Sequence, residues 1–255
     1  MIHRVVERLA LIAACVLALT GGVYADAEKP RLPGIKGTDD RQRIESAAYP
    51  WGAIGRVNRR TGGFCTGVLI GPREVLTAAH CLWNGRTRRL LPPQSLHFVT
   101  GYRRGAYLAE AAVVALRLSP GYRLPPAANP DVADDWAVLV LARDIGAVAT
   151  PLAVGRLSEG AAAGADGDEV RLVQAGYSQD RAHILTVHDG CTLLGRGSGG
   201  RLLFHDCDAT HGDSDSPILL RRGDRYTVIG IHVATGSQSG RSIGISAAAF
   251  QASEQ

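Results

Sequence analysis

Short apolar runs separated by turn residues dominate the chain beyond residue 50. In the first half these runs cover residues 53–57, 67–70, 74–77, 96–100, 111–118 and 137–141. Gly, Pro or polar residues follow each run, which is the pattern of β-strands joined by turns. The first half is therefore predicted to contain about six strands.

The second half repeats this rhythm. Its candidate strands cover residues 169–176, 182–187, 192–194, 201–205, 217–220 and 226–233. Two sets of antiparallel strands predict an all-β fold of two closed six-stranded barrels, because closure removes the unpaired edges of a sheet. We expect the first barrel at about 44–141, the second at about 152–255, and a short helix at 247–253.

The composition supports this fold class. The chain has 31 Gly and 12 Pro residues and only 5% aromatic residues, which suits many short strands better than a helical bundle. Its net charge of +4 comes from Lys and Arg spread along the chain, and the densest run, 86–89, has no interleaved aromatic residues on which bases could stack. We therefore expect no nucleic-acid partner.

The first 27 residues have the pattern of an export signal. His3, Arg4 and Arg8 precede an apolar run over 9–20, which small residues and the tripeptide 25–27 follow. This run is too short to span a bilayer, and no later segment has the roughly 20 apolar residues of a membrane helix. We expect a signal peptide and a secreted or periplasmic protein without a membrane span.

Two further features concern the same end of the chain. A lipoprotein cleavage box at 12–15 is an alternative to the signal peptide, but the apolar run continues beyond Cys15, where a tether should be polar. Residues 28–43 contain prolines and show no periodicity, so they are predicted to be a propeptide or an extended arm. The folded domain would then begin at residue 44.

Four cysteines would follow the signal. They are Cys65, Cys81, Cys191 and Cys207, an even number in a chain bound for an oxidising compartment. Three pairings are possible, and we favour Cys65 with Cys81 and Cys191 with Cys207 because each pair closes an interval of 16 residues. The chain has no Cys-x-x-Cys spacing, so a zinc site is the less favoured alternative.

Three segments supply the residues of a nucleophilic serine site. His80 ends Leu-Thr-Ala-Ala-His before a cysteine, Asp135 begins Asp-Trp-Ala-Val-Leu-Val-Leu, and Ser214 lies in Gly-Asp-Ser-Asp-Ser-Pro. A serine hydroxyl attacks well only when an imidazole takes its proton and a carboxylate orients that imidazole. The chain order His, Asp, Ser is that of the chymotrypsin class.

Further segments in a fixed order make the resemblance specific. They are 37–41 (Gly-Thr-Asp-Asp-Arg), 48–51 (Ala-Tyr-Pro-Trp), 65–67 (Cys-Thr-Gly) and 70–72 (Ile-Gly-Pro). From about residue 37 to 250 the chain resembles the trypsin-like serine peptidases, nearest to the bacterial glutamyl endopeptidases. The resemblance implies barrels of the chymotrypsin type and a monomeric endopeptidase that cleaves proteins or peptides with no metal and no cofactor.

Two of the three site residues have close competitors. Asp134 is adjacent to Asp135, but Asp135 is the last polar residue before the apolar run that begins at Trp136. Ser216 competes with Ser214, but only Ser214 follows the Gly-Asp pair that the family places before its nucleophile. We therefore expect His80, Asp135 and Ser214 to form the catalytic triad.

The resemblance also assigns roles to the neighbours of Ser214. The backbone N–H groups of Gly212 and Ser214 are expected to form the oxyanion hole. In trypsin-like zymogens the residue that matches Asp213 pairs with a newly freed α-amino group, and the junctions 43–44 and 34–35 are candidates for that cleavage.

Asp215 departs from the family pattern, which has Gly directly after the nucleophile. A residue with a Cβ resists the backbone angles that Gly adopts. A charge at about 5 Å from the oxyanion, at an effective dielectric of about 20, would cost roughly 3 kcal/mol, which is a rate loss of about a hundredfold. The alternative function is therefore a binding module on a disabled peptidase scaffold, unless Asp215 points into solvent.

Two residues bear on the substrate pocket. Asp208 lies six residues before Ser214, at the offset where trypsin-like enzymes place the carboxylate that receives Arg or Lys. His232 matches the histidine that glutamyl endopeptidases use against the substrate carboxylate. The flanking sequence favours a preference for an acidic P1 residue, the residue whose carbonyl is attacked. A basic P1 preference, and a mutual pairing of Asp208 with His232, remain open.

Overall fold

The computed structural model describes residues 32–125, 131–158, 171–235 and 240–251. The predicted signal peptide and residues 28–31 of the predicted arm lie outside this described part. No helix among the described residues is long and apolar enough to cross a membrane.

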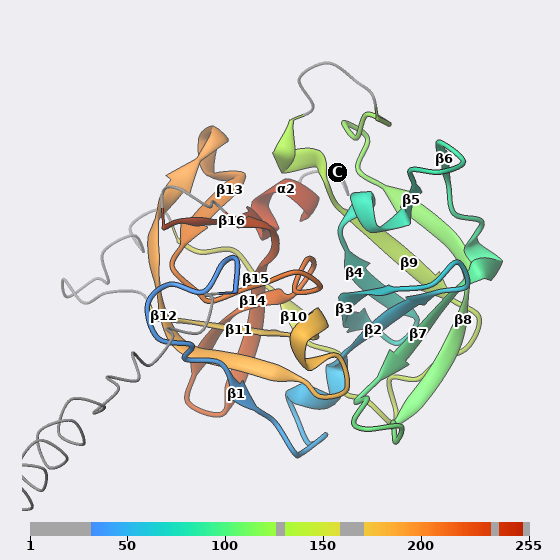
Figure 1. Cartoon of the computed structure of the whole chain (residues 1–255), viewed down its shortest axis with the longest axis horizontal. Coiled ribbons are helices and arrows are strands. Elements are labelled where there is room, and N and C mark those ends of the chain that lie inside the picture. Colours follow the sequence, from blue (N-terminus) through green and yellow to red (C-terminus); the bar gives the residue numbers. More distant parts are fainter. Residues whose placement is uncertain (1–31, 126–130, 159–170, 236–239, 252–255) are drawn as a thin grey trace, which may run out of the picture. The chain divides into compact units, whose positions relative to one another are not determined.

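Six antiparallel strands close the first barrel in the order β2-β3-β4-β9-β8-β7 (Figure 1). Apolar residues alternate with more exposed ones along these strands: in β9, Ala137, Leu139 and Leu141 are buried and the residues between them are partly exposed. The strands are β2 (Ile54–Arg59), β3 (Phe64–Gly71), β4 (Glu74–Thr77), β7 (Leu96–Thr100), β8 (Ala109–Leu118) and β9 (Ala137–Leu141).

Six further strands close the second barrel in the order β12-β11-β14-β15-β16-β13, because β13 also pairs with β12. The short strands β1 (Gln42–Arg43) and β10 (Ala153–Val154) extend this sheet by pairing with β12 and β15. The six barrel strands are β11 (Arg171–Gly176), β12 (Thr186–Gly197), β13 (Leu202–His205), β14 (Pro217–Arg222), β15 (Arg225–Thr235) and β16 (Ser242–Ser246).

The two-barrel, all-β prediction is confirmed, with two corrections in the second barrel. The segment expected at 192–194 lies within β12, whereas the segment expected at 182–187 overlaps β12 only at 186–187. Strand β12 is continuous because Gly190, with a φ of 96°, does not end the pairing. Strand β16 was not predicted, because Ser and Gly interrupt its apolar residues. The strand count stays at six because one error offsets the other.

Short elements connect the strands. In the described part of the chain, the β5–β6 hairpin and α2 accompany six single-turn 3₁₀ helices, and α2 is the described part of the helix expected at 247–253. The elements are η1 (Trp51–Ala53), η2 (Ala79–Leu82), β5 (Trp83–Asn84), β6 (Arg89–Leu90), η3 (Pro93–Ser95), η4 (Val132–Asp134), η5 (Gln179–Arg181), η6 (Ser198–Gly200) and α2 (Ala247–Gln251).

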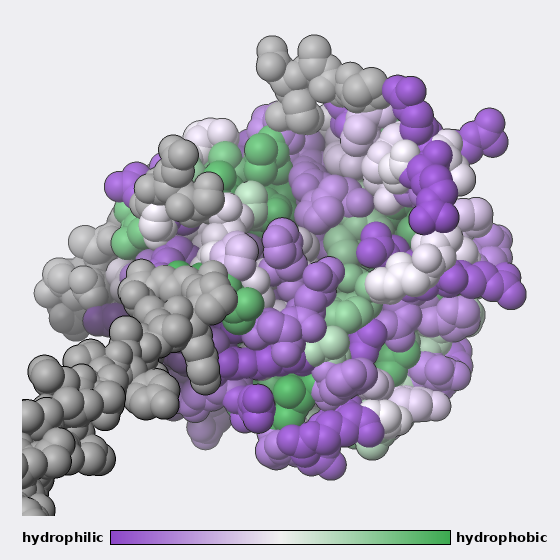
Figure 2. Space-filling model, viewed as in Figure 1, coloured by the Kyte–Doolittle hydropathy of each residue, from purple (hydrophilic) through white to green (hydrophobic). Residues whose placement is uncertain are grey.

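The apolar core is shared between the barrels. One buried cluster contains residues of the first barrel, such as Phe98, together with residues of the second, such as Tyr177 and Ile231. At the chain's last helix, Phe250 packs against Trp136 with their ring centres 5.9 Å apart. The face seen in Figure 2 is mainly hydrophilic, with small apolar patches between polar side chains.

Both favoured disulfides are present. Cys65 is bonded to Cys81 and Cys191 to Cys207, each across a sequence separation of 16. The first joins β3 to η2, which carries His80, and the second joins β12 to the segment after β13. Each disulfide therefore restrains one barrel.

Replacing Cys191 and Cys207 together by Ser is expected to lower the free energy of unfolding by about 3 kcal/mol, because a loop of this length loses its closure in the unfolded chain. Urea unfolding followed by tryptophan fluorescence measures the change. The Cys65–Cys81 pair has the same separation but borders the site residues, so the Cys191–Cys207 pair isolates the effect of loop closure. An unchanged free energy of unfolding would contradict the prediction.

Candidate active site

His80 and Asp135 are held together at the edge of the first barrel. The Nδ1 atom of His80 lies 2.6 Å from Asp135 Oδ2, and the backbone N–H of His80 donates to Asp135 Oδ1 at 2.7 Å. His80 lies in η2, directly after β4, and Asp135 directly follows η4. Two bonds to one carboxylate fix both the imidazole and the backbone that carries it.

The structure distinguishes Asp135 from its neighbour. Asp134 turns away from His80, accepting from Ser119 Oγ at 2.9 Å and from Arg201 Nη2 at 2.6 Å. Asp135 is therefore the carboxylate that orients His80, as the apolar run after it suggested.

The electrostatic surroundings make His80 strongly basic. Burial lowers the pKa of His80, but the hydrogen bond to Asp135 and the negative charges of Asp215 and Asp135 outweigh burial and raise the pKa from 6.5 to about 9. The half-exposed imidazole can thus take a proton readily, and it becomes a free base only in alkaline solution.

Ser214 lies in the turn before β14, in the second barrel, and its side chain makes no hydrogen bond to His80 in the described structure. Thr66 of β3 fixes this turn, because its N–H donates to Ser214 O at 3.3 Å and its hydroxyl donates to Gly212 O at 3.4 Å. Gly212 has a φ of 94°, and a Cβ there would lie 2.8 Å from Gln179 N, so only glycine fits.

The turn presents two unused backbone donors. No acceptor in the described part of the chain takes the N–H of Gly212 or of Ser214. These are the two groups expected to form the oxyanion hole. Ser216, the competing serine, is fully buried and its Oγ has no described partner.

Ser214 and His232 line one cavity of about 350 Å³. The wall of this cavity consists of Pro33, Gly34, Thr210, His211, Ser214, His232, Val233, Ala234 and Thr235. His232 is buried, its Nε2 lies 3.1 Å from Thr235 Oγ1, and its Nδ1 lies 3.4 Å from His205 Nε2. A side chain bound beside Ser214 would therefore meet an imidazole and hydroxyl groups.

Asp208 is not among the residues that line this cavity. Its carboxylate accepts from the backbone N–H of Lys36 at 2.7 Å and from that of Asp40 at 3.0 Å. These bonds attach the amino-terminal arm to the second barrel and occupy both carboxylate oxygens. Asp208 and His232 therefore do not pair with each other in the structure.

Lys36, which the sequence analysis did not identify, contributes a positive charge close to His232. Its Nζ donates to Cys207 O at 2.7 Å and to Ser242 Oγ at 2.8 Å. Burial and the positive charge of Lys36 lower the pKa of His232 to about 3, and the same two causes help to lower the pKa of His205. His232 is therefore neutral, and the positive charge near the cavity belongs to Lys36.

Arg41 is a second buried cation that the sequence did not single out. Its side chain is 2% exposed and lies 2.9 Å from Asp39, 2.9 Å from Asp180 and 3.6 Å from Asp213. Asp213 also accepts from Thr210 N at 2.8 Å, and burial raises the pKa of Asp213 to about 7. The arm thus supplies Asp213 with a cationic partner, the Arg41 side chain. The resemblance to trypsin-like zymogens had suggested a newly freed α-amino group as this partner.

Asp215 points into the barrel interface and not into solvent. It is 0% exposed, has a φ of 77°, and its Oδ2 lies 2.9 Å from Thr77 Oγ1. One carboxylate oxygen and the sulfurs of Cys65 and Cys81 lie within 4.8 Å of one another. Because these sulfurs are bonded to each other, they are not thiolate ligands for a metal.

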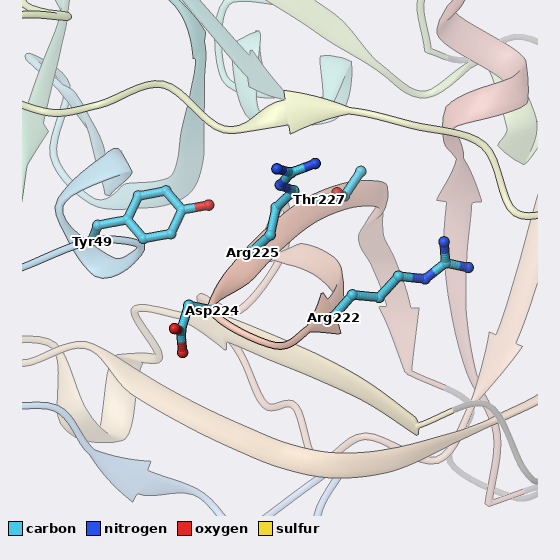
Figure 3. Close-up of a pocket in the computed structure, with 5 residues that line it drawn as sticks. All are labelled: Tyr49, Arg222, Asp224, Arg225 and Thr227. Atoms are coloured by element: carbon cyan, nitrogen blue, oxygen red, sulfur yellow. The ribbon is translucent and has the colours of Figure 1, made fainter.

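A larger hollow of about 600 Å³ lies at the β14–β15 turn (Figure 3). Its described lining comes from that turn and from the segment before η1: Tyr49, Arg222, Asp224, Arg225 and Thr227. No imidazole and none of the expected site residues line it. Of the expected site residues, Ser214 and His232 line the smaller cavity, and His80 and Asp135 line neither of the two.

Replacing Arg41 by Met is expected to lower the free energy of unfolding at pH 7 by about 3 kcal/mol, because it leaves carboxylates without their buried cation. The pKa values of Asp39 and Asp180 are lowered in the folded protein despite burial, through the bonds to Arg41. Their contribution is present above pH 3.8 and is lost as the pH falls through the lowered values. Urea unfolding at several pH values measures this difference.

Arg104→Met is the matched control. The bridge from Arg104 to Glu45 is more than half exposed on both sides, so its loss should change the free energy of unfolding by less than about 1 kcal/mol. Equal losses in the two variants would contradict a special role for the buried Arg41 cluster.

Known proteins share this architecture. The family model described as Trypsin matches residues 37–254. A glutamyl endopeptidase of Bacillus licheniformis is 41% identical over 54 residues, which is 21% of this chain but only 17% of that protein. A solved structure of a Glu endopeptidase in complex with MPD superposes with a TM-score of 0.70 and 19% identity, covering 87% of this chain and 99% of that one.

These comparisons differ in what they establish. At 19% identity the superposition shows a shared fold, and the relative from Bacillus is matched over a small part of its length. The family model covers most of this chain, from the arm to the carboxyl-terminal residues. The chain therefore belongs to the trypsin family, as its sequence motifs indicated.

Proposed function

We propose that this chain is a serine endopeptidase that acts through His80, Asp135 and Ser214. The observation that carries the proposal is the bidentate contact between Asp135 and His80, together with a turn of the second barrel that offers Ser214 and two unused N–H donors. A scaffold that only binds has no physical need for this combination. Proteins or peptides are the expected substrates.

Each residue then has a defined task. Ser214 Oγ attacks the substrate carbonyl while His80 Nε2 takes the hydroxyl proton, and Asp135 stabilises the imidazolium through Nδ1–H. The N–H groups of Gly212 and Ser214 bind the oxyanion. When the resulting tetrahedral intermediate collapses, the peptide bond breaks and the leaving amine takes the proton from His80. Water then attacks the acyl-enzyme by the same route and restores Ser214.

An acidic P1 residue fits the cavity best. A carboxylate bound there would lie close to the neutral His232 and the hydroxyls of Thr210 and Thr235, with the charge of Lys36 behind them. A lysine or arginine side chain would meet the same positive charge without a free carboxylate, because the oxygens of Asp208 are bonded to the arm. This argument favours the acidic over the basic preference.

Export from the cytoplasm is part of the proposal. Two disulfides are typical of proteins that fold in an oxidising compartment. They agree with the signal pattern in residues 1–27 and with a protein that is secreted or periplasmic.

Ser214→Ala is expected to abolish hydrolysis of fluorogenic peptides, whereas Ser216→Ala, a change in the same turn, should retain it. In the active protein, kcat/KM should rise with pH and level off well above the ordinary histidine pKa of 6.5, because His80 must lose its proton to act as a base. The measurement is kcat/KM from about pH 5 to 10.

Two results would contradict the proposal. Hydrolysis that persists in Ser214→Ala would place the activity elsewhere. Absence of hydrolysis in the wild type across all P1 residues, combined with high-affinity peptide binding, would support the binding-module alternative.

Lys36→Met is expected to lower kcat/KM for a Glu substrate by about tenfold, the effect of roughly 1.4 kcal/mol, while changing a Leu substrate little. The measurement compares matched peptides that differ only at P1. Arg43→Met, which removes another cation of the same arm, serves as the control. An equal loss for Glu and Leu substrates would mean that Lys36 only holds the arm in place.

A further inference from the structure

Asp215 combines three features that rarely occur together. It directly follows Ser214, it is completely buried, and its φ of 77° lies in the left-handed region. Aspartate is among the few non-glycine residues that tolerate this region. Its backbone N–H donates to His232 O at 2.7 Å, which ties the Ser214 turn to β15.

The hydrogen bonds of Thr77 indicate the protonation state of this acid. Thr77 Oγ1 lies 2.9 Å from Asp215 Oδ2 and 3.0 Å from Thr66 O. A threonine hydroxyl has one hydrogen, and a backbone carbonyl can only accept. Two full hydrogen bonds, with no hydrogen shared between acceptors, therefore require that Thr77 donates to Thr66 and that a protonated Asp215 donates to Thr77.

The surroundings of the carboxyl agree with a neutral group. Asp215 Oδ1 has no partner among the described residues, although it is fully buried. The disulfide Cys65–Cys81 lies beside it. An orphan oxygen costs far less on a neutral acid than on a carboxylate. Burial raises the pKa of Asp215 most strongly and the negative Asp135 adds to this, while His80, Thr77 and the backbone of Ala78 lower it; the net pKa is about 7.

The charged groups near Asp215 come from both barrels. The first barrel contributes His80 in η2 and Asp135 after η4, while β3 and β4 contribute the uncharged disulfide and Thr77. The second barrel contributes His232, through its backbone oxygen, and its imidazole is neutral. Among the described groups, His80 and Asp135 are therefore the ones whose protonation depends on the charge of Asp215.

We propose that Asp215 is a positioning residue for the His80 site: protonated, it links the Ser214 turn to β4 through Thr77, and ionised, it places a second negative charge beside the imidazole. The ionised acid would hold the proton on His80 and keep it from acting as a base. This inference rests on the proposed function only in naming His80 as that base.

The direct test uses NMR titration of His80 in protein labelled at histidine nitrogen, with His80→Ala to assign the signal. Asp215→Asn is nearly isosteric, tolerates a positive φ and stays neutral at every pH. We expect it to lower the pKa of His80 by about one to two units, since it removes a nearby charge. Asp224→Asn, at the exposed β14–β15 turn, should leave this pKa unchanged.

A second readout detects the proton itself. Buried Asp213 also has a pKa of about 7, so the readout is the infrared C=O difference between the wild type and Asp215→Asn. This difference should contain one protonated carboxyl band near pH 5 that fades as the pH rises through about 7. Thr77→Val should shift the frequency of this band, because it removes the acceptor. An unchanged pKa of His80 in Asp215→Asn, or no loss of a protonated carboxyl band in that variant, would overturn the proposal.

Both readouts are spectroscopic and need no turnover. A protein that hydrolyses no peptide but shows both effects would refute the proposed function and retain this inference. If Asp215→Asn does not fold, Asp215→Gly replaces it, because glycine removes the charge and adopts a φ of 77° without strain. In an active enzyme, the rising limb of kcat/KM should move to lower pH by the same one to two units.

Discussion

Thr66 is the residue through which the two halves of the site are aligned. It belongs to the first barrel, yet its hydroxyl accepts from Tyr177 N at 2.9 Å and donates to Gly212 O, and its N–H donates to Ser214 O. Its own carbonyl accepts from Thr77, which precedes η2 and His80. Because Thr66 is fully buried and every one of these groups is used, a shift of one barrel would break several bonds at once.

The amino-terminal arm adds two buried cations to the second barrel. Arg41 forms an ion pair with Asp213, and Lys36 places a positive charge close to His232. Burying a cation is costly unless acceptors surround it, and both side chains meet this condition with carboxylates or carbonyl oxygens. The arm is thus an integral part of the described structure, although its sequence shows no periodicity.

The sequence predicted what depends on local pattern. Short apolar runs between turn residues predicted β4, β7 and β9 with their observed bounds, and the apolar run that begins at Trp136 favoured Asp135 over Asp134. What it could not predict depends on contacts across many residues. Lys36 meets the carbonyl of Cys207 at a separation of 171 residues, and no local signal indicates such a partner. For the same reason the sequence suggested that Asp208 is a pocket carboxylate, whereas in the structure it binds the arm.

Asp215 shows why an unusual residue must be judged by its surroundings. In the sequence it suggested damage, through strain at the backbone and charge near the oxyanion. The strain is real, since a left-handed residue costs about 1–2 kcal/mol, but two hydrogen bonds hold the turn, from its N–H to His232 and between its carboxyl and Thr77. The charge penalty applies only to the ionised form. Burial favours the protonated form, so the protein avoids most of this penalty as long as the proton stays in place.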